Sequence, residues 1–219
     1  MGTDDIHHKT KARRAESHRR KMATRPQFER VLIVCEGEKT EPNYFKGLRK
    51  ALGLNPMNVV IADKKRGLDP KSLVEYALEE YRKDRDIEHV YCVFDRDKHT
   101  TYDATIDKVR STRLKIGHSM EAITSIPCFE IWMLLHFTYT TRSFCAAGND
   151  SNCALVMSDL KKYIPGYEKG ATDVFIGDDR LEAAIKRAKQ LEEFHLTSGT
   201  DNPSTMIYKL VEHLRDLKR

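Results

Sequence analysis

The chain has 219 residues, of which 40% are hydrophobic and 32% are charged, so it can bury the core of a folded domain. No stretch approaches the roughly 20 apolar residues that span a bilayer, and the first residues lack the apolar segment of a secretory signal. Composition therefore excludes a membrane-spanning protein, and we expect a cytoplasmic one that does not bind membranes.

The positive charge is concentrated at the start of the chain. Residues 1–27 carry eight Lys or Arg against three Asp or Glu, a balance of +5 that equals the net charge of the whole chain. Such a polar segment cannot bury enough apolar surface to fold alone, so we expect a basic, flexible tail. It either contacts nucleic-acid phosphates or is simply solvated. The residues expected to make such contacts are Arg13, Arg14, Arg19, Arg20 and Lys21.

Strands and helices alternate along the first half of the chain. Short β-branched or apolar runs predict strands over 30–37, 58–62, 89–95 and 120–126. Helices are expected between them, capped by Thr40 in the first case and by Asp69 with Pro70 in the second, and over 102–114 in the third. This alternation predicts a parallel sheet with helices on its faces, whose ligands bind at the carboxyl ends of the strands.

After residue 126 the pattern becomes helical. The segment "PCFEIWMLLHF" is almost continuously apolar and predicts a buried helix over 127–137. Further helices are expected over 151–164, 178–194 and 202–218, the last with Asn202 as cap and Pro203 in its first turn. We therefore divide the chain into a tail (1–27), an α/β core (28–126) and a helical part packed on that core (127–219).

The cysteines predict no disulfide framework. There are five, an odd number, and no Cys-x-x-Cys occurs. We expect Cys145 and Cys153 to be unpaired loop thiols rather than part of a metal cluster with His136.

Carboxylates end two of the predicted strands. Glu36, followed by Gly37, ends the first strand, and Asp95 and Asp97 end the third. Asp95 and Asp97 are two residues apart, so on extended backbone they point to the same face and repel each other unless a cation is present. Strand-end aspartates often only solvate turns. If the two strands are neighbours, however, the three carboxylates converge on a site suited to Mg²⁺ or Mn²⁺.

Other polar residues are weaker candidates. Lys39 could touch phosphate, and Glu41 either joins the site or only favours a helix N-terminus. Glu130 in the apolar segment needs a partner, either the metal or a hydrogen bond, and His136 is either a proton shuttle or structural. The basic residues after the second strand either contact a nucleic-acid backbone or form a solvated loop: Lys64, Lys65 and Arg66. Tyr167 and Lys169 could border the substrate.

Four ordered motifs resemble the RloB-like family, whose core is similar to a Toprim domain. They are "EGEKTEPNYF", "VFDRDKH", "IPCFEIWMLLHF" and "NPSTMIYKLVEHL". The resemblance implies a Toprim-like sheet in which Asp95 and Asp97 hold Mg²⁺ while Glu36 shares the metal or acts as general acid or base. The family pattern has asparagine where this chain has Ile126, so we assign that position no role. The family is associated with bacterial anti-phage defence, often beside an ABC-type ATPase.

The resulting expectation is an Mg²⁺-dependent (or Mn²⁺-dependent) Toprim-like nuclease that cleaves DNA or RNA, including tRNA, as the effector of a defence system. The alternative is a non-catalytic or regulatory module that binds an ABC-type ATPase. A nucleotidyl-transfer enzyme has less support, because the chain lacks a Gly-x-x-x-x-Gly-Lys loop. The neutral body suggests that tight binding of nucleic acid requires the tail, a partner or an oligomer.

Overall fold

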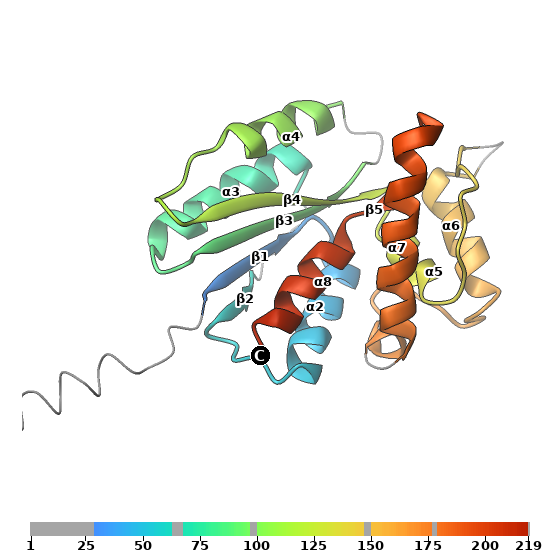
Figure 1. The fold of residues 1–219 in the computed structure, drawn as a ribbon, viewed down its shortest axis with the longest axis horizontal. Coiled ribbons are helices and arrows are strands. Elements are labelled where there is room, and N and C mark those ends of the chain that lie inside the picture. Colours follow the sequence, from blue (N-terminus) through green and yellow to red (C-terminus); the bar gives the residue numbers. More distant parts are fainter. Residues whose placement is uncertain (1–28, 63–67, 97–99, 147–149, 177–178, 219) are drawn as a thin grey trace, which may run out of the picture.

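A five-stranded sheet forms the centre of the computed structural model (Figure 1), which describes residues 29–62, 68–96, 100–146, 150–176 and 179–218. The strand order is β2-β1-β3-β4-β5; neighbours among the first four are parallel, and β5 is antiparallel to β4. The strands are β1 (Val31–Cys35), β2 (Val59–Ile61), β3 (His89–Asp95), β4 (Ser119–Ile126) and β5 (Ser204–Thr205).

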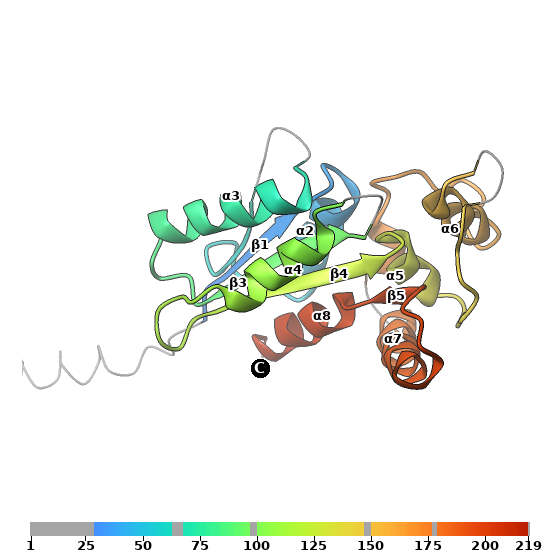
Figure 2. The ribbon, with the colours of Figure 1, turned by 90° about the horizontal axis from the view of Figure 1, so that it is seen from above.

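Helices cover both faces of this sheet. One face carries α3 (Pro70–Lys83) and α4 (Tyr102–Ser111), and the other carries α2 (Thr40–Ala51) and α8 (Ile207–Asp216), as Figure 2 shows for α3, α4 and α8. The side chains of β1 explain why. Leu32 and Val34 pack into the core beneath α3 and α4, whereas alternate residues of the same strand pack into the core on the α2 and α8 side.

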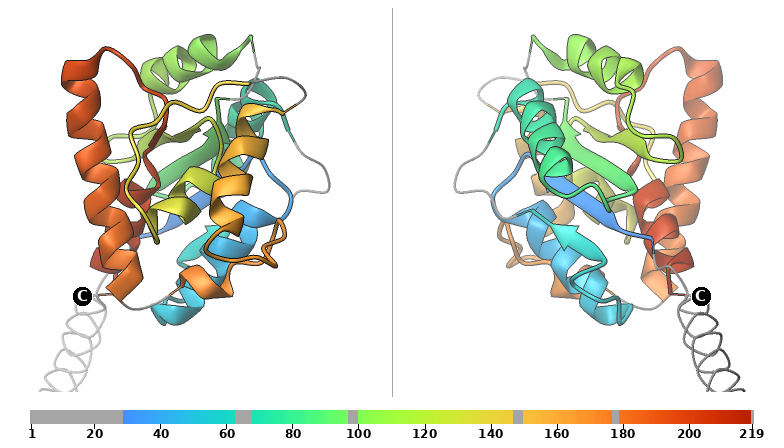
Figure 3. Two further views of the ribbon diagram at one scale, coloured as in Figure 1. Left: turned by 90° about the vertical axis from the view of Figure 1, so that its right-hand side faces the viewer. Right: turned by 90° about the vertical axis from the view of Figure 1, so that its left-hand side faces the viewer.

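The remaining helices lie beyond the carboxyl ends of the strands (Figures 1 and 3). They are α5 (Glu130–Leu135), α6 (Asn152–Lys161), the 3₁₀ turn η1 (Asp173–Phe175) and α7 (Asp179–Ser198). All six residues of α5 are buried, so this short helix is surrounded by the rest of the fold. The predicted class is confirmed: an α/β fold with a mostly parallel sheet flanked by helices and a largely helical second half.

Capping of the first two helices was predicted with mixed success. Asp69 caps α3 as expected, because its carboxylate accepts hydrogen bonds from the amides of Lys71 and Ser72 at 3.1 and 3.3 Å. The expectation for Thr40 was wrong. Lys39 occupies the cap position and Thr40 is the first helical residue of α2.

The helix predicted over 127–137 is shorter than the apolar pattern suggested. Pro127 follows Ile126 through a cis peptide bond, and α5 begins only at Glu130. The apolar run reflects complete burial rather than a continuous helix, since a segment surrounded by other elements is apolar on every side.

The predicted start of the last helix, at residue 202, was also wrong. Ser204 and Thr205 pair with Ile126 and Ser125 as an antiparallel strand, and α8 begins at Ile207. Asn202 is no cap, because its side chain bonds to the backbone of Phe144, with its Oδ1 accepting from the amide at 3.2 Å and its Nδ2 donating to the carbonyl at 2.9 Å. The segment thus extends the sheet, which supplies the backbone partners that a helix would otherwise have provided.

One cysteine prediction is corrected. Cys128, which precedes α5, and Cys153 in α6 form a disulfide, so Cys153 is not an unpaired loop thiol. Cys35 and Cys92 are buried free thiols, and Cys145 is free and exposed. The link joins residues that are 25 apart in sequence, a pairing that spacing alone does not reveal.

Candidate functional site

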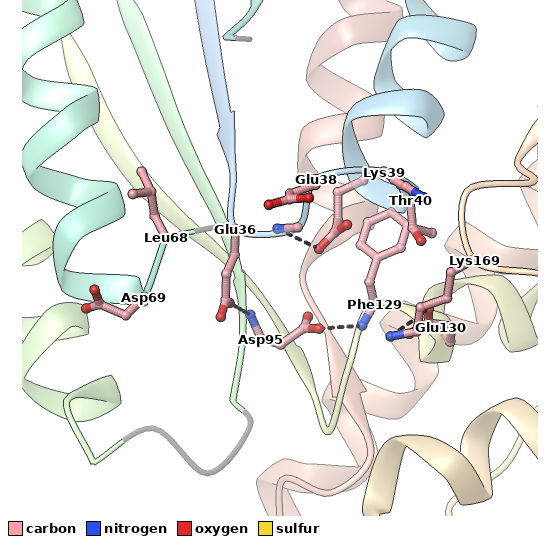
Figure 4. A pocket seen from close by; sticks show the side chains of 12 residues that line it. Glu36, Glu38, Lys39, Thr40, Leu68, Asp69, Asp95, Phe129, Glu130 and Lys169 are labelled. Carbon is pink, nitrogen blue, oxygen red and sulfur yellow. Dashed lines mark hydrogen bonds and ion pairs between the residues drawn. The ribbon is translucent and has the colours of Figure 1, made fainter. Parts of the chain in front are cut away.

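A pocket of about 540 Å³ lies at the carboxyl ends of β1 and β3 (Figure 4). Its wall comes from the loop after β1, the start of α3, the end of β3, the start of α5 and the loop before η1. The lining residues are Glu36, Gly37, Glu38, Lys39, Thr40, Glu41, Leu68, Asp69, Asp95, Phe129, Glu130 and Lys169.

Glu36 and Asp95 meet because β1 and β3 are parallel neighbours, with Cys35 paired to Val93. The amide of Asp95 donates a hydrogen bond to Oε2 of Glu36 at 2.9 Å. Oδ2 of Asp95 in turn accepts a bond from the amide of Phe129 at 3.1 Å. Backbone groups therefore hold both carboxylates in place at the sheet edge, where the sequence had predicted that they converge.

Glu41 approaches the same pocket from the first turn of α2. Its side chain bends back so that Oε1 accepts a hydrogen bond from the amide of Gly37 at 3.2 Å. A β-carbon at position 37 would lie 2.1 Å from Oε2 of Glu41, so only glycine allows this arrangement. The lack of a side chain at position 37 thus makes room for the Glu41 carboxylate, whatever the backbone angles of Gly37 are.

Glu130, the first residue of α5, completes the acidic wall. It is 2% exposed, and Nζ of Lys169 lies 3.7 Å from its Oε1. The loop that carries Lys169 is fixed to α2 by a 3.0 Å hydrogen bond from Nδ2 of Asn43 to the carbonyl of Gly170. Six carboxylates line the pocket, and four of them lie close enough to influence one another electrostatically: Glu36, Glu41, Asp95 and Glu130.

The crowding of these groups changes their acidity. Burial raises the pKa of Asp95 well above its usual value, and the charges of Glu41, Glu130 and Glu36 raise it further. Burial also raises the pKa of Glu41, with Glu130 and Glu36 adding to the effect. An additional positive charge in this pocket would relieve both desolvation and repulsion.

The donor set fits a hard divalent cation. Carboxylate oxygens are the protein ligands that Mg²⁺ and Mn²⁺ prefer, and such ions keep several coordination positions for water or substrate phosphate. The residues that could hold the ion are the four carboxylates named above, which we call the acidic cluster.

His136 lies apart from this pocket. Its Nδ1 is 2.9 Å from the carbonyl of Trp132, and its ring packs edge to face against Trp132 and Phe175. Burial lowers the pKa of His136 to about 4, which favours a neutral ring at physiological pH. These contacts fit the structural alternative for His136. Lys39 lines the pocket and is exposed to solvent.

Several predicted residues lie outside the described part of the chain. These are Asp97, Lys64, Lys65, Arg66 and the tail residues Arg13, Arg14, Arg19, Arg20 and Lys21. Their expected contacts stay predictions. The residue between the two aspartates is described. Arg96 bonds through its guanidinium group to the carboxylate of Asp201.

Some residues that line the pocket are not indicated by any sequence pattern. Leu68 and Asp69 line it because α3 begins beside the sheet edge, and Phe129 contributes a backbone amide that no side-chain motif reveals. Lys169 had been noted only as a possible border of the substrate. Its position depends on how the loop before η1 packs against α2, which local patterns do not specify.

Comparisons with known proteins identify a family. The model of the RloB-like protein family matches residues 31–214. Neither the curated proteins nor the solved structures contain a match to this chain. Among the described residues, no helix is long and apolar enough to cross a membrane. The matched region spans most of the chain, from β1 into α8, and so the chain belongs to the RloB-like protein family.

Proposed function

We propose that this protein is a divalent-cation-dependent phosphodiester hydrolase of the Toprim-like nuclease type. The observation that carries the proposal is the acidic cluster: four carboxylates from the loop after β1, the start of α2, the end of β3 and the start of α5 line one pocket. Such a cluster is unfavourable by itself and becomes favourable around Mg²⁺ or Mn²⁺.

When bound, the cation would stabilise charge that develops on a phosphate and lower the pKa of water. The chain's own groups would hold and orient the reactants. Glu36 and Asp95 are fixed by backbone hydrogen bonds, so they need little reorganisation during the reaction. We assign Glu36 a second task, which is to move the proton of the attacking water. Lys39 and Lys169 at the pocket would contact substrate phosphates.

The substrate class follows from this chemistry and from the family resemblance. A phosphodiester of DNA or RNA, including tRNA, matches a site of carboxylates flanked by lysines. We place the activity in anti-phage defence, with an ABC-type ATPase as partner. The competing function is a regulatory module that binds the ATPase and uses the acidic cluster for metal binding without turnover.

A cleavage assay tests the proposal. Full-length protein is incubated with plasmid DNA, single-stranded DNA and total tRNA, in Mg²⁺, Mn²⁺ or EDTA, with and without the ATPase. We expect metal-dependent cleavage of at least one substrate, and a loss of at least ~100-fold for Glu36→Gln, the usual scale of general acid or base catalysis. Glu79→Gln, an exposed position on α3, is the matched control.

Two results would contradict the proposal. Cleavage that persists at full rate in EDTA or in Glu36→Gln would place the chemistry elsewhere. Tight Mn²⁺ binding without turnover on any substrate, even with the ATPase present, would favour the regulatory module.

A further inference from the structure

A cluster of one carboxylate and two imidazoles lies at the amino ends of β1 and β3, whereas the acidic cluster lies at their carboxyl ends. Glu29 precedes β1, His89 is the first residue of β3, and His213 lies in the last turn of α8. These three residues are far apart in sequence and meet because α8 runs back beside the sheet toward the start of β1 (Figure 1).

We propose that Glu29, His89 and His213 form a binding site for a divalent transition metal of the Zn²⁺ type. Two imidazole nitrogens and one carboxylate oxygen are a ligand set of zinc sites that keep a fourth position open. This site is separate from the acidic cluster in both its position and its ligands.

The distances suit tetrahedral coordination. Nε2 of His89 lies 3.3 Å from Oε2 of Glu29, and Nε2 of His213 lies 3.2 Å from the same oxygen. Two ligands that are each about 2.0–2.1 Å from a tetrahedral ion are themselves roughly 3.4 Å apart. The two rings are close and steeply inclined, with centroids 4.9 Å apart and planes at 78°. Small side-chain shifts would therefore place all three atoms around one ion.

Each imidazole also has a hydrogen-bond partner at its other ring nitrogen, Nδ1. Nδ1 of His89 lies 2.9 Å from the hydroxyl of Ser119, and Nδ1 of His213 lies 2.7 Å from the hydroxyl of Tyr91. These partners orient the rings and leave both Nε2 atoms facing Glu29. Outer partners on the second ring nitrogen are a regular feature of metal-binding histidines.

The alternative is a hydrogen-bonded trio in which both imidazoles donate to Glu29. That arrangement also fits the distances, because one carboxylate oxygen can accept two hydrogen bonds, and binding of a metal ion distinguishes the two arrangements. The side chains are partly open to solvent, with exposed fractions of 23% for His89, 22% for His213 and 49% for Glu29. An ion could therefore enter directly, and water could fill the remaining coordination position.

The site would have a structural consequence. It would link the end of α8 to the residues before β1 and the start of β3, which are themselves joined by hydrogen bonds from the amides of Glu88 and His89 to the carbonyl of Arg30 at 2.8 and 3.1 Å. Glu29 also follows the basic segment 1–27 closely in sequence. Metal binding would thus fix the point at which that segment joins the folded body.

Cobalt spectroscopy on the full-length protein tests the proposal. Co²⁺ in a four-coordinate site with nitrogen ligands gives visible absorption that hexaaqua Co²⁺ lacks. We expect one equivalent of Co²⁺ to bind with such absorption and to be displaced by Zn²⁺ but not by Mg²⁺, which prefers oxygen ligands. Binding should weaken at least ~10-fold in His213→Ala and in Glu29→Gln. The Glu29 side chain is exposed, so its replacement by Gln leaves the fold intact and isolates the loss of a ligand.

Three control variants make the test specific. His118→Ala removes a histidine that pairs with Tyr81 on the other face of the sheet, His7→Ala with His8→Ala removes the paired tail histidines, and Asp95→Asn weakens the acidic cluster. Each should keep the cobalt spectrum. The proposal is overturned if no Co²⁺ or Zn²⁺ binds at millimolar concentration, if the tail or Asp95 variant loses the spectrum, or if the His213 and Glu29 variants retain it. Because the readout is cobalt absorption, failure here leaves the proposed hydrolase activity untouched.

Discussion

The environment of Asp95 disfavours the charged form of its carboxyl group. Asp95 is partly buried and its carboxylate faces three others, while the hydrogen bond from the amide of Phe129 opposes the rise in its pKa. A carboxyl group whose pKa is raised by folding holds a proton in the folded protein that the unfolded chain has already released. The free energy of unfolding must therefore fall as the pH rises from about 4 through the raised pKa.

The first prediction concerns this pH dependence. Without metal, Asp95→Asn should remove part of the loss of stability at alkaline pH, because asparagine carries no charge yet can still accept from Phe129. At pH 8 in EDTA the variant should be more stable than the wild type by on the order of 1 kcal/mol, since one unit of pKa shift corresponds to about 1.4 kcal/mol. Chemical denaturation at pH 5 and pH 8 measures the difference.

Asp107→Asn, at an exposed position of α4, is the control and should show no such change. A lower stability of Asp95→Asn than of the wild type at pH 8 would mean that the carboxylate is stabilising and that the repulsion described here is offset by other contacts.

The second prediction concerns Gly37. In Gly37→Ala the new methyl group would occupy the space of the Glu41 carboxylate, so that side chain must move out of the pocket. Because the carboxylate is the end of a flexible side chain, the fold should survive with a small loss of stability, while Mn²⁺ affinity falls ~10-fold. Gly166→Ala, where a β-carbon meets no atom within 4 Å, should leave Mn²⁺ affinity unchanged. Equal affinities in both variants would exclude Glu41 as a ligand.

At the residue scale, the sequence predicted the part of the site that depends on strand pairing. Glu36 and Asp95 converge because parallel neighbouring strands end at one edge, which the alternating pattern already indicated. The contributions of Glu41, Glu130 and Lys169 depend on a bent side chain, a short buried helix and a docked loop. These are tertiary features, and residue spacing carries no signal for them.

The element that differs most from the sequence-based expectation is the segment before α8. Asn202 and Pro203 resemble the start of a helix, but here the chain adds β5 to the edge of β4. Its anchor is Asn202, which bonds to both backbone groups of Phe144. A side chain that bonds to a distant backbone cannot at the same time cap a local helix.

The third prediction tests this anchor. Asn202→Ala should lower the free energy of unfolding by about 1–3 kcal/mol, because the amide and carbonyl of Phe144 lose their partner in a partly buried place. Ser143→Ala removes a single exposed bond to the carbonyl of Asn202 and should lower it by less than ~1 kcal/mol. Urea denaturation compares the two variants, and equal effects would show that the Asn202 side chain is no anchor.

At the element scale, strands and helices with an amphipathic or bounded pattern were predicted well. The α3 cap and the four parallel strands are examples. Fully buried segments were predicted poorly, because uniform burial removes the periodicity that distinguishes a helix from a turn. The segment before α5 is an example.

The whole molecule combines a neutral body with a basic amino-terminal segment. Residues 28–219 carry 30 Lys or Arg and 30 Asp or Glu, so any long-range attraction of nucleic acid would depend on residues 1–27. A nuclease site with four carboxylates would itself repel phosphate until a cation binds. Attraction of nucleic acid would therefore depend on the amino-terminal segment, and the chemistry on the pocket at the carboxyl ends of β1 and β3.

The fourth prediction concerns this division. Deleting residues 1–27 should leave the melting temperature nearly unchanged, weaken nucleic-acid binding and flatten its dependence on salt, because fewer counterions are released. A full-length variant with Arg13, Arg14, Arg19, Arg20 and Lys21 replaced by Gln should behave like the deletion if charge, rather than length, is responsible. Fluorescence anisotropy from about 50 to about 300 mM salt, a range in which such slopes are measurable, gives the comparison. An unchanged slope would make the segment a solubilising extension.

The most direct test of the acidic cluster as a cation site is a titration of the full-length protein with Mn²⁺, followed by the paramagnetic resonance of the free ion. We expect saturable binding that weakens about 10-fold to 100-fold in Asp95→Asn and in Glu36→Gln, the scale on which loss of a ligating group acts. Asp107→Asn and His213→Ala should bind Mn²⁺ at this site as the wild type does. Wild-type affinity in Asp95→Asn and Glu36→Gln would contradict the assignment, because the ion would then be held without the two carboxylates that end β1 and β3.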